Sequence, residues 1–161
     1  MTKEPLQTPS EEAIQAWARL IRAGGSVLAA VEADLKAEGF PPLSWYDVLL
    51  ELRRTPEGRL RPLEIEQHLL IAQHNVSRLI DRLEKAGLVE RSRCKADGRG
   101  QWVVLTEAGR ALLRQMWPAY AAAIQRRFAE KLCGEEQAVL AGLLGKLIDR
   151  APACGRPPST E

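Results

Sequence analysis

Residues 72–105 read AQHNVSRLIDRLEKAGLVERSRCKADGRGQWVVL. In the first half, apolar side chains recur every three or four residues, at Val76, Leu79, Ile80 and Leu83. That spacing predicts an amphipathic helix over 72–87, which would start near Ala72 and end at Gly87. In the second half, two β-prone runs, LVERSRC and QWVVL, flank the charged turn KADGRG, which predicts a two-stranded hairpin.

The polar face of this helix is unusual for a surface helix, because no acidic residue precedes Asp81. It carries amide, imidazole, hydroxyl and guanidinium groups, at Gln73, His74, Asn75, Ser77, Arg78 and Arg82. Planar amide and guanidinium groups match the donors and acceptors that base edges present in the major groove of DNA. The alternative is a solvated face on which the arginines pair with Asp81 and Glu84.

Helical periodicity and end signals predict the flanking elements. A helix follows Ser10 and runs to Gly39, with Gly24-Gly25 indicating close helix packing or a kink. A second begins at Ser44, with Asp47 completing its cap. The tripeptide RLR at 59–61 suits a short strand, and a third helix begins at Pro62. After the hairpin, Thr106 caps a long helix, and a last helix covers 135–150.

Composition narrows the functional classes. The chain has 161 residues, is 45% apolar and carries a net charge of +2, so it is long enough for one or two packed domains. No apolar run is long enough to cross a bilayer and the N-terminus lacks a secretory signal, so we expect a cytoplasmic protein. Cys94, Cys133 and Cys154 are far apart, which argues against disulfides and structural zinc, and passive thiols are favoured over redox sensors.

Charge is concentrated in the middle of the chain. Between Arg53 and Arg110 there are 12 basic against 8 acidic residues, whereas the rest of the chain has 11 basic against 13 acidic residues. A basic centre suits a polyanionic partner. Short helices followed by a hairpin, in this order, predict a winged helix-turn-helix.

Residues 75–113 resemble the MarR family of bacterial transcription regulators. The motifs that carry the resemblance are Gly87-Leu88-Val89 with Arg91, Asp97 with Arg99, and Leu105-Thr106 with Gly109. The resemblance implies a mainly α fold with a small β-hairpin, in which a winged helix-turn-helix DNA-binding domain (42–106) is joined to a helical dimerisation region (10–41 and 107–151). Residues 1–9 and 152–161 are expected to be a disordered arm and tail.

The resemblance also implies the DNA contacts. Arg99 would enter the minor groove from the wing, which is the predicted hairpin with its charged turn, and Asp97 would hold Arg99 in place. Asn75, Ser77 and Arg78 fall where relatives contact bases and phosphates. Arg82 would contact phosphate or brace the wing. Four further residues complete the predicted DNA-binding set: Gln73, His74, Arg93 and Lys95.

The amphipathic helices at the two ends are too apolar to lie bare, and the resemblance implies that they interlock with a second copy as a two-fold homodimer. The alternative, a helical cap within a monomer, would leave more of the apolar stripe uncovered. Relatives often hold a small molecule between the dimer helices and the winged domain. The candidate lining residues here are Trp17, Ile21, Trp45, Tyr46, Leu49, Trp117 and Tyr120. Their indole and phenol groups would suit a small aromatic effector, although aromatic residues at helical spacing are more often core.

The sequence therefore predicts a sequence-specific, dimeric DNA-binding regulator, a repressor of a palindromic operator that a small aromatic ligand releases. The alternative is a winged-helix module that binds protein and not DNA. An enzyme is not expected, because the sequence has no phosphate-binding loop, metal-ligand cluster or nucleophile motif. No cofactor and no metal are expected.

Overall fold

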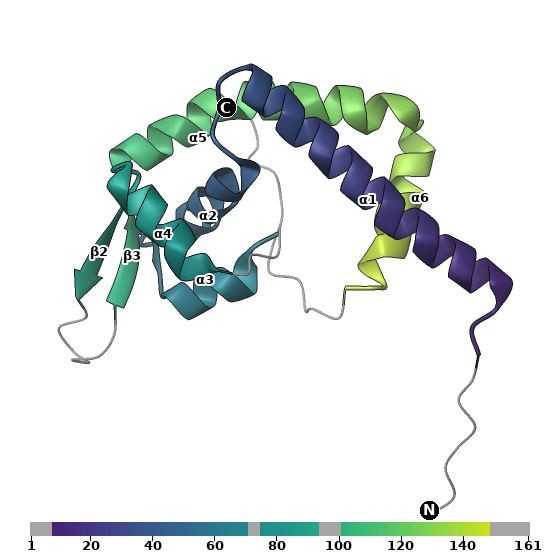
Figure 1. Ribbon diagram of the computed structural model, residues 1–161, viewed down its shortest axis with the longest axis horizontal. Coiled ribbons are helices and arrows are strands. Elements are labelled where there is room, and N and C mark those ends of the chain that lie inside the picture. Colours follow the sequence, from purple (N-terminus) through teal and green to yellow (C-terminus); the bar gives the residue numbers. More distant parts are fainter. Residues whose placement is uncertain (1–7, 71–74, 94–100, 149–161) are drawn as a thin grey trace, which may run out of the picture.

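The computed structural model describes residues 8–70, 75–93 and 101–148 (Figure 1). Its elements are α1 (Glu11–Ala37), α2 (Leu43–Arg54), β1 (Arg59–Leu60), α3 (Pro62–His68), α4 (Val76–Lys85), β2 (Val89–Arg93), β3 (Gln101–Leu105), α5 (Glu107–Arg127), the 3₁₀ turn η1 (Ala129–Lys131) and α6 (Gly134–Gly145). The mainly α fold with a small sheet is the predicted one, and α2 to β3 follow in winged helix-turn-helix order. No described helix is long and apolar enough to cross a membrane.

The sheet has three antiparallel strands in the order β1-β3-β2. In the predicted hairpin, Val89 pairs with Leu105 and Arg93 pairs with Gln101. The short strand expected at 59–61 is present as β1, which pairs Arg59 with Val104 at the edge of the sheet. The wing is therefore attached to the chain segment that leads into α3.

The hydrophobic core lies between α2, α3, α4, the inner face of the sheet and α5. The predicted apolar stripe of α4 is confirmed, since all four of its side chains are buried: Val76, Leu79, Ile80 and Leu83. Burial stabilises the fold by roughly 1.5–3 kcal/mol for each such side chain. This burial fixes which face of α4 remains outside.

Three helix boundaries, each signalled in the sequence, are confirmed. Pro62 occupies the first turn of α3. Thr106 caps α5, its side chain accepting a hydrogen bond from the Gly109 N–H. Gly87 has φ +73° and ends α4, with the Leu88 N–H donating to the Leu83 carbonyl at 3.0 Å. Glycine adopts this left-handed conformation without steric penalty.

Three other predicted boundaries are wrong. α2 begins at Leu43 with no side-chain cap, because the extended conformation of Pro42 precedes the helix and leaves Ser44 inside the first turn. α4 begins at Val76 and not near Ala72, because Asn75 is the N-cap. Asparagine is a far better cap than alanine. α6 spans Gly134–Gly145 in place of 135–150.

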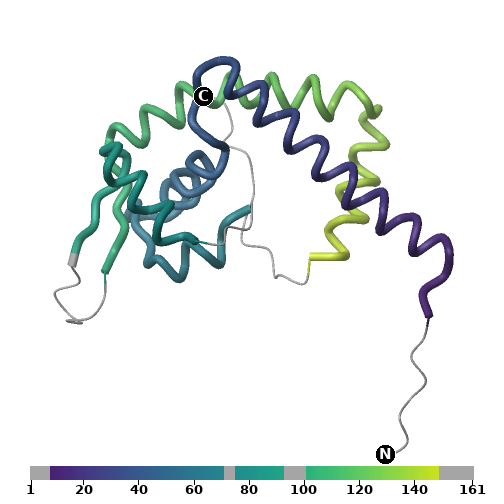
Figure 2. The backbone as a smooth tube through the Cα atoms, viewed as in Figure 1, coloured from purple at the N-terminus to yellow at the C-terminus, as the bar shows by residue number. Residues whose placement is uncertain are grey.

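α5 extends from the winged domain and packs against α1, and α6 turns back from the far end of α5 (Figure 2). Asp34 of α1 bonds to Arg126 and Arg127 at the end of α5, the closest pair at 2.6 Å. The hydrogen bond from Arg127 is the main reason that the pKa of Asp34 falls to about 2. Gly24 and Gly25 have open space around them, so the expected helix packing there is not made within the described part of this chain.

Candidate nucleic-acid interface

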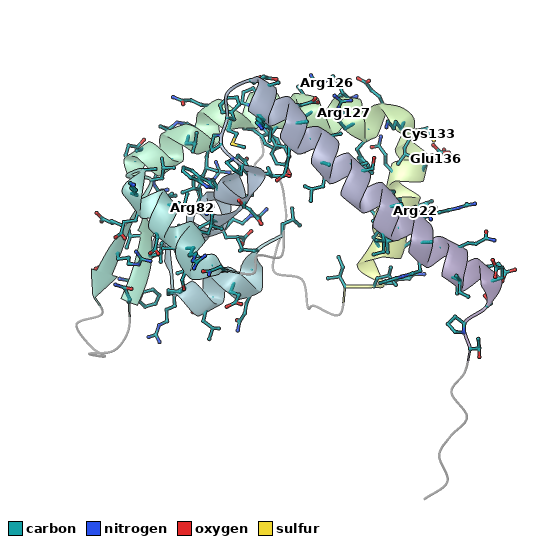
Figure 3. All side chains as sticks on the ribbon, in the orientation of Figure 1. Arg22, Arg82, Arg126, Arg127, Cys133 and Glu136 are labelled. Carbon is teal, nitrogen blue, oxygen red and sulfur yellow. The ribbon has the colours of Figure 1, made fainter. Side chains whose placement is uncertain are left out.

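The outer face of α4 is polar and exposed. Ser77, Arg78, Asp81 and Arg82 all lie on it, and Figure 3 labels Arg82 on this helix. Neither Arg78 nor Arg82 makes an ion pair with any residue in the described ranges. The salt-bridged face considered from the sequence is therefore not formed, because both nearby carboxylates have a different partner.

That partner is Arg91 on β2. Its guanidinium bonds to Asp81 at 2.5 Å and to Glu84, and its backbone N–H donates to Glu84 Oε1 at 3.2 Å. Burial lowers the pKa of Arg91, but the hydrogen bonds to Asp81 and Glu84 outweigh it and the net pKa is raised. The side chain that braces the wing against α4 is thus Arg91 and not Arg82.

Asn75 has a structural role that the sequence prediction missed. Its Oδ1 accepts a hydrogen bond from the Arg78 N–H at 3.0 Å, which closes the first turn of α4. The side chain is exposed at the end of the helix that would lead into a groove. Of the other predicted contacts, Arg93 ends β2, whereas five lie outside the described residues: Gln73, His74, Lys95, Asp97 and Arg99.

The two halves of the family motif meet in space. The Thr106 hydroxyl donates to the Gly87 carbonyl at 2.8 Å, and the Thr106 N–H donates to the Leu88 carbonyl at 3.2 Å. A Cβ on Gly109 would lie 2.3 Å from that Leu88 oxygen, so only glycine fits. These contacts fix the end of α4 to the start of α5.

The outer face of the sheet carries a second arginine arrangement. Arg59 and Arg61 lie over the Trp102 ring, at 4.7 and 5.1 Å from its centre. Arg59 also forms an ion pair with Glu57. Such cation–π contacts hold β1 and the start of α3 against the wing. The sequence analysis missed this cluster, because the register of β1 on β3 is a tertiary property.

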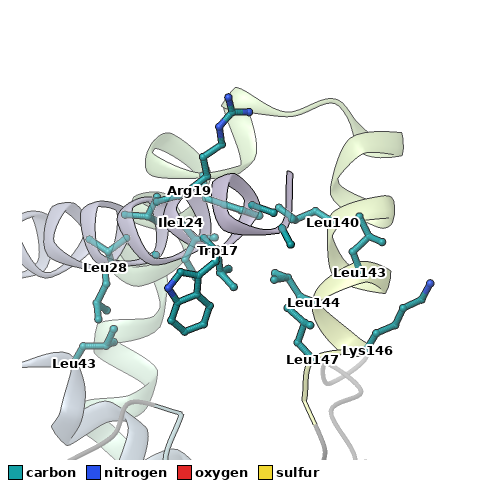
Figure 4. A pocket seen from close by; sticks show the side chains of 18 of the residues that line it. Trp17, Arg19, Leu28, Leu43, Ile124, Leu140, Leu143, Leu144, Lys146 and Leu147 are labelled. Carbon is teal, nitrogen blue, oxygen red and sulfur yellow. The ribbon is translucent and has the colours of Figure 1, made fainter. Parts of the chain in front are cut away.

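A cavity of about 1010 Å³ lies between α1, α5 and α6. Figure 4 shows Trp17 facing it from α1 and Leu144 from α6, and its lining is almost wholly apolar. Of the seven predicted ligand-binding residues, Trp17 and Tyr120 line this cavity, and the remaining five do not: Ile21, Trp45, Tyr46, Leu49 and Trp117. Leu49 has no exposed surface and belongs to the core, so its assignment to a ligand pocket is wrong for this cavity.

Three of the predicted aromatic residues pack against one another, and one of them, Tyr120, also lines the cavity. The Tyr120 ring packs edge-on against Tyr46 at 5.2 Å and against Trp117 at 6.0 Å. Burial raises the pKa of both tyrosines above its ordinary value. Among the described residues no group of side chains could hold a metal ion, and Cys133 is an exposed free thiol.

Comparison with known proteins gives the family. The MarR family model matches residues 38–100. YkoM of Bacillus subtilis (strain 168), an uncharacterized HTH-type transcriptional regulator, is 33% identical over 136 residues, which span 84% of this chain and 86% of YkoM.

Two solved structures are also similar. Sco3205, a MarR family transcriptional regulator of Streptomyces coelicolor solved in complex with DNA, has a TM-score of 0.79 and 27% identity over 90% of this chain and 91% of its own. BpsR of Bordetella bronchiseptica, whose DNA binding is regulated by 6-hydroxynicotinic acid, has a TM-score of 0.74 and 26% identity over 89% and 100%. The family and these relatives are regulators and not enzymes. Because the similarity to YkoM covers most of both chains, the protein belongs to the MarR family and is a transcriptional regulator.

Proposed function

We propose that the protein binds an inverted repeat in double-stranded DNA as a homodimer and represses transcription there. The observation that carries this proposal is the outer face of α4, where Arg78 and Arg82 are exposed and unpaired among the described residues. Arginine reads guanine by paired hydrogen bonds, and each good pair discriminates by about 1–3 kcal/mol. The similar regulator Sco3205, which was solved in complex with DNA, supports DNA as the partner.

The contacts then divide by element. Ser77 and Arg78 at the start of α4 would meet base edges, with Gln73, His74 and Asn75 at the leading end. Arg82 would contact phosphate. The wing would follow the neighbouring minor groove through Arg99, held by Asp97, with Arg93 and Lys95 on its flanks.

The proposed dimer interface lies within the helical region made by the two chain ends (10–41 and 107–151), on the exposed faces of α1 and of residues 134–148. In the single chain, α1 and residues 134–148 expose large apolar side chains, which is typical of a surface that a partner covers. These side chains are Ile14, Trp17, Ile21, Val139, Leu143, Leu147 and Ile148. A two-fold pair uses the same surface on both subunits and would place the two α4 helices about one helical turn apart, roughly 34 Å. Bound over a promoter, such a dimer would exclude the polymerase.

A small aromatic effector is the second part of the proposal. The regulation of BpsR by 6-hydroxynicotinic acid supports it, as do the aromatic rings of Tyr46, Trp117 and Tyr120 close to where α5 leaves the winged domain. An effector that favours one spacing of the two α4 helices would lower DNA affinity. An effector that binds both spacings equally would leave DNA affinity unchanged.

The test is selection of binding sites from a random duplex library, followed by measurement of the mass of the complex. The proposal predicts an enriched inverted repeat, two protein chains per duplex, and an affinity that falls steeply as salt rises. If no duplex is enriched at any salt concentration, the protein is instead a winged-helix module for protein partners.

A further inference from the structure

α4 carries two carboxylates on a helix that the proposed function brings against phosphates. Asp81 and Glu84 lie three residues apart and therefore on adjacent positions of the helix surface. Their side chains are 60% and 40% exposed. Unpaired, they would repel the DNA backbone, and Asp81 would also be a neighbour of Arg78 three residues before it.

Arg91 occupies the position that resolves this conflict. It lies on the inner side of β2, where its side chain is only 21% exposed, and it reaches both carboxylates from outside the helix. A guanidinium with two carboxylate partners and a backbone hydrogen bond to one of them is a better partner for Asp81 than an exposed Arg78. Arg78 is consequently left without an acidic partner among the described residues.

We propose that Arg91 is a positioning residue for DNA recognition: by binding Asp81 and Glu84 it neutralises part of the negative charge of α4 and leaves Arg78 free to reach DNA. This inference rests on the proposed DNA-binding function. It differs from a purely structural role, because it requires the charge of the two carboxylates to be what Arg91 counteracts.

The experiment compares equilibrium binding to a duplex selected by the wild-type protein, across a range of salt concentrations. Arg91→Gln should weaken binding about tenfold at low salt, with the effect shrinking as salt screens the exposed carboxylates. Arg91→Lys keeps the positive charge but loses the paired hydrogen bonds of the guanidinium, so its DNA affinity should lie between those of wild type and Arg91→Gln. Urea titration of each variant identifies the conditions under which all of them are folded.

The decisive variant combines Asp81→Asn and Glu84→Gln with Arg91→Gln. Like Arg91→Gln, this triple variant lacks both ion pairs of Arg91, but it also lacks the two carboxylates that would repel DNA. Its DNA affinity should therefore return to within about threefold of wild type. The matched control is Arg114→Gln, which also removes one positive charge from an ion pair, that with Glu107 on α5, and should leave affinity unchanged.

Two results would overturn the inference while leaving the proposed function intact. One is wild-type affinity in Arg91→Gln. The other is a triple variant that stays as weak as Arg91→Gln, which would show that Arg91 acts only through the fold. A wild-type protein that selects no duplex would instead overturn the proposed function, and this inference with it.

Discussion

Asn75 allows stability and DNA binding to be separated by substitution at one position. Its side chain caps α4 through the hydrogen bond to Arg78, so Asn75→Ala should lower the free energy of unfolding by about 1 kcal/mol. Asn75→Asp keeps the cap and adds a negative charge at the positive end of the helix, which should be neutral or stabilising by about 0.3–1 kcal/mol.

Asn75→Asp should weaken DNA binding even though it keeps or raises the stability of the fold. A carboxylate about 5 Å from a phosphate in water is repelled by roughly 0.8 kcal/mol, so two nearby phosphates would weaken binding about tenfold. Asn75→Asp should therefore be the more stable but weaker-binding variant. Asn75→Ser, which keeps the cap without a charge, is the control.

The assays are urea denaturation followed by circular dichroism, and fluorescence anisotropy with a labelled duplex. If Asn75→Asp bound DNA as tightly as wild type, the start of α4 would not approach the backbone. If Asn75→Ala were as stable as wild type, the capping argument itself would be refuted.

Three further predictions concern the rest of the molecule. Gly109→Ala should lower unfolding free energy by about 1–3 kcal/mol or more, because its Cβ meets a carbonyl oxygen; urea titration would refute this if the midpoint did not move. The pKa of Asp34 is lowered to about 2, so its contribution to stability is present above its ordinary pKa and is lost as pH falls toward 2. The urea-midpoint difference between wild type and Asp34→Asn should shrink across that window, and a constant difference would contradict it. Leu147→Asp should give monomers in sedimentation, whereas Leu63→Asp, at an equally exposed apolar position (66% and 64%), should not; dimers in both would rule out the proposed interface.

The local sequence predicts those parts of this fold that depend on periodicity and on single special residues. The stripe from Val76 to Leu83 and the stop at Gly87 are properties of neighbouring residues, and both are confirmed. The start of α2 is not predicted correctly, because Ser44 and Asp47 make a plausible cap that the conformation of Pro42 overrides.

The candidate site is less accessible to sequence reasoning, because its decisive contacts join separate elements. Arg91 is visible as a motif residue, but its pairing with Asp81 and Glu84 depends on how β2 folds back on α4. In the same way, Leu49 is a pocket candidate only through the resemblance to the family, and the packing of the core shows that it is enclosed. Asn75 is the exception, since a known capping residue before an apolar stripe was a readable signal.

The central claim is that the outer face of α4 reads base pairs in two symmetric half-sites. The most direct measurement is the set of sequences enriched from a random duplex library by the wild-type protein, by Arg78→Ala and by the control Arg114→Ala. The account predicts an inverted repeat for the wild type and the control, and loss of preference at one or more symmetric positions in Arg78→Ala. An identical preference in all three proteins would contradict the claim that Arg78 on α4 reads sequence.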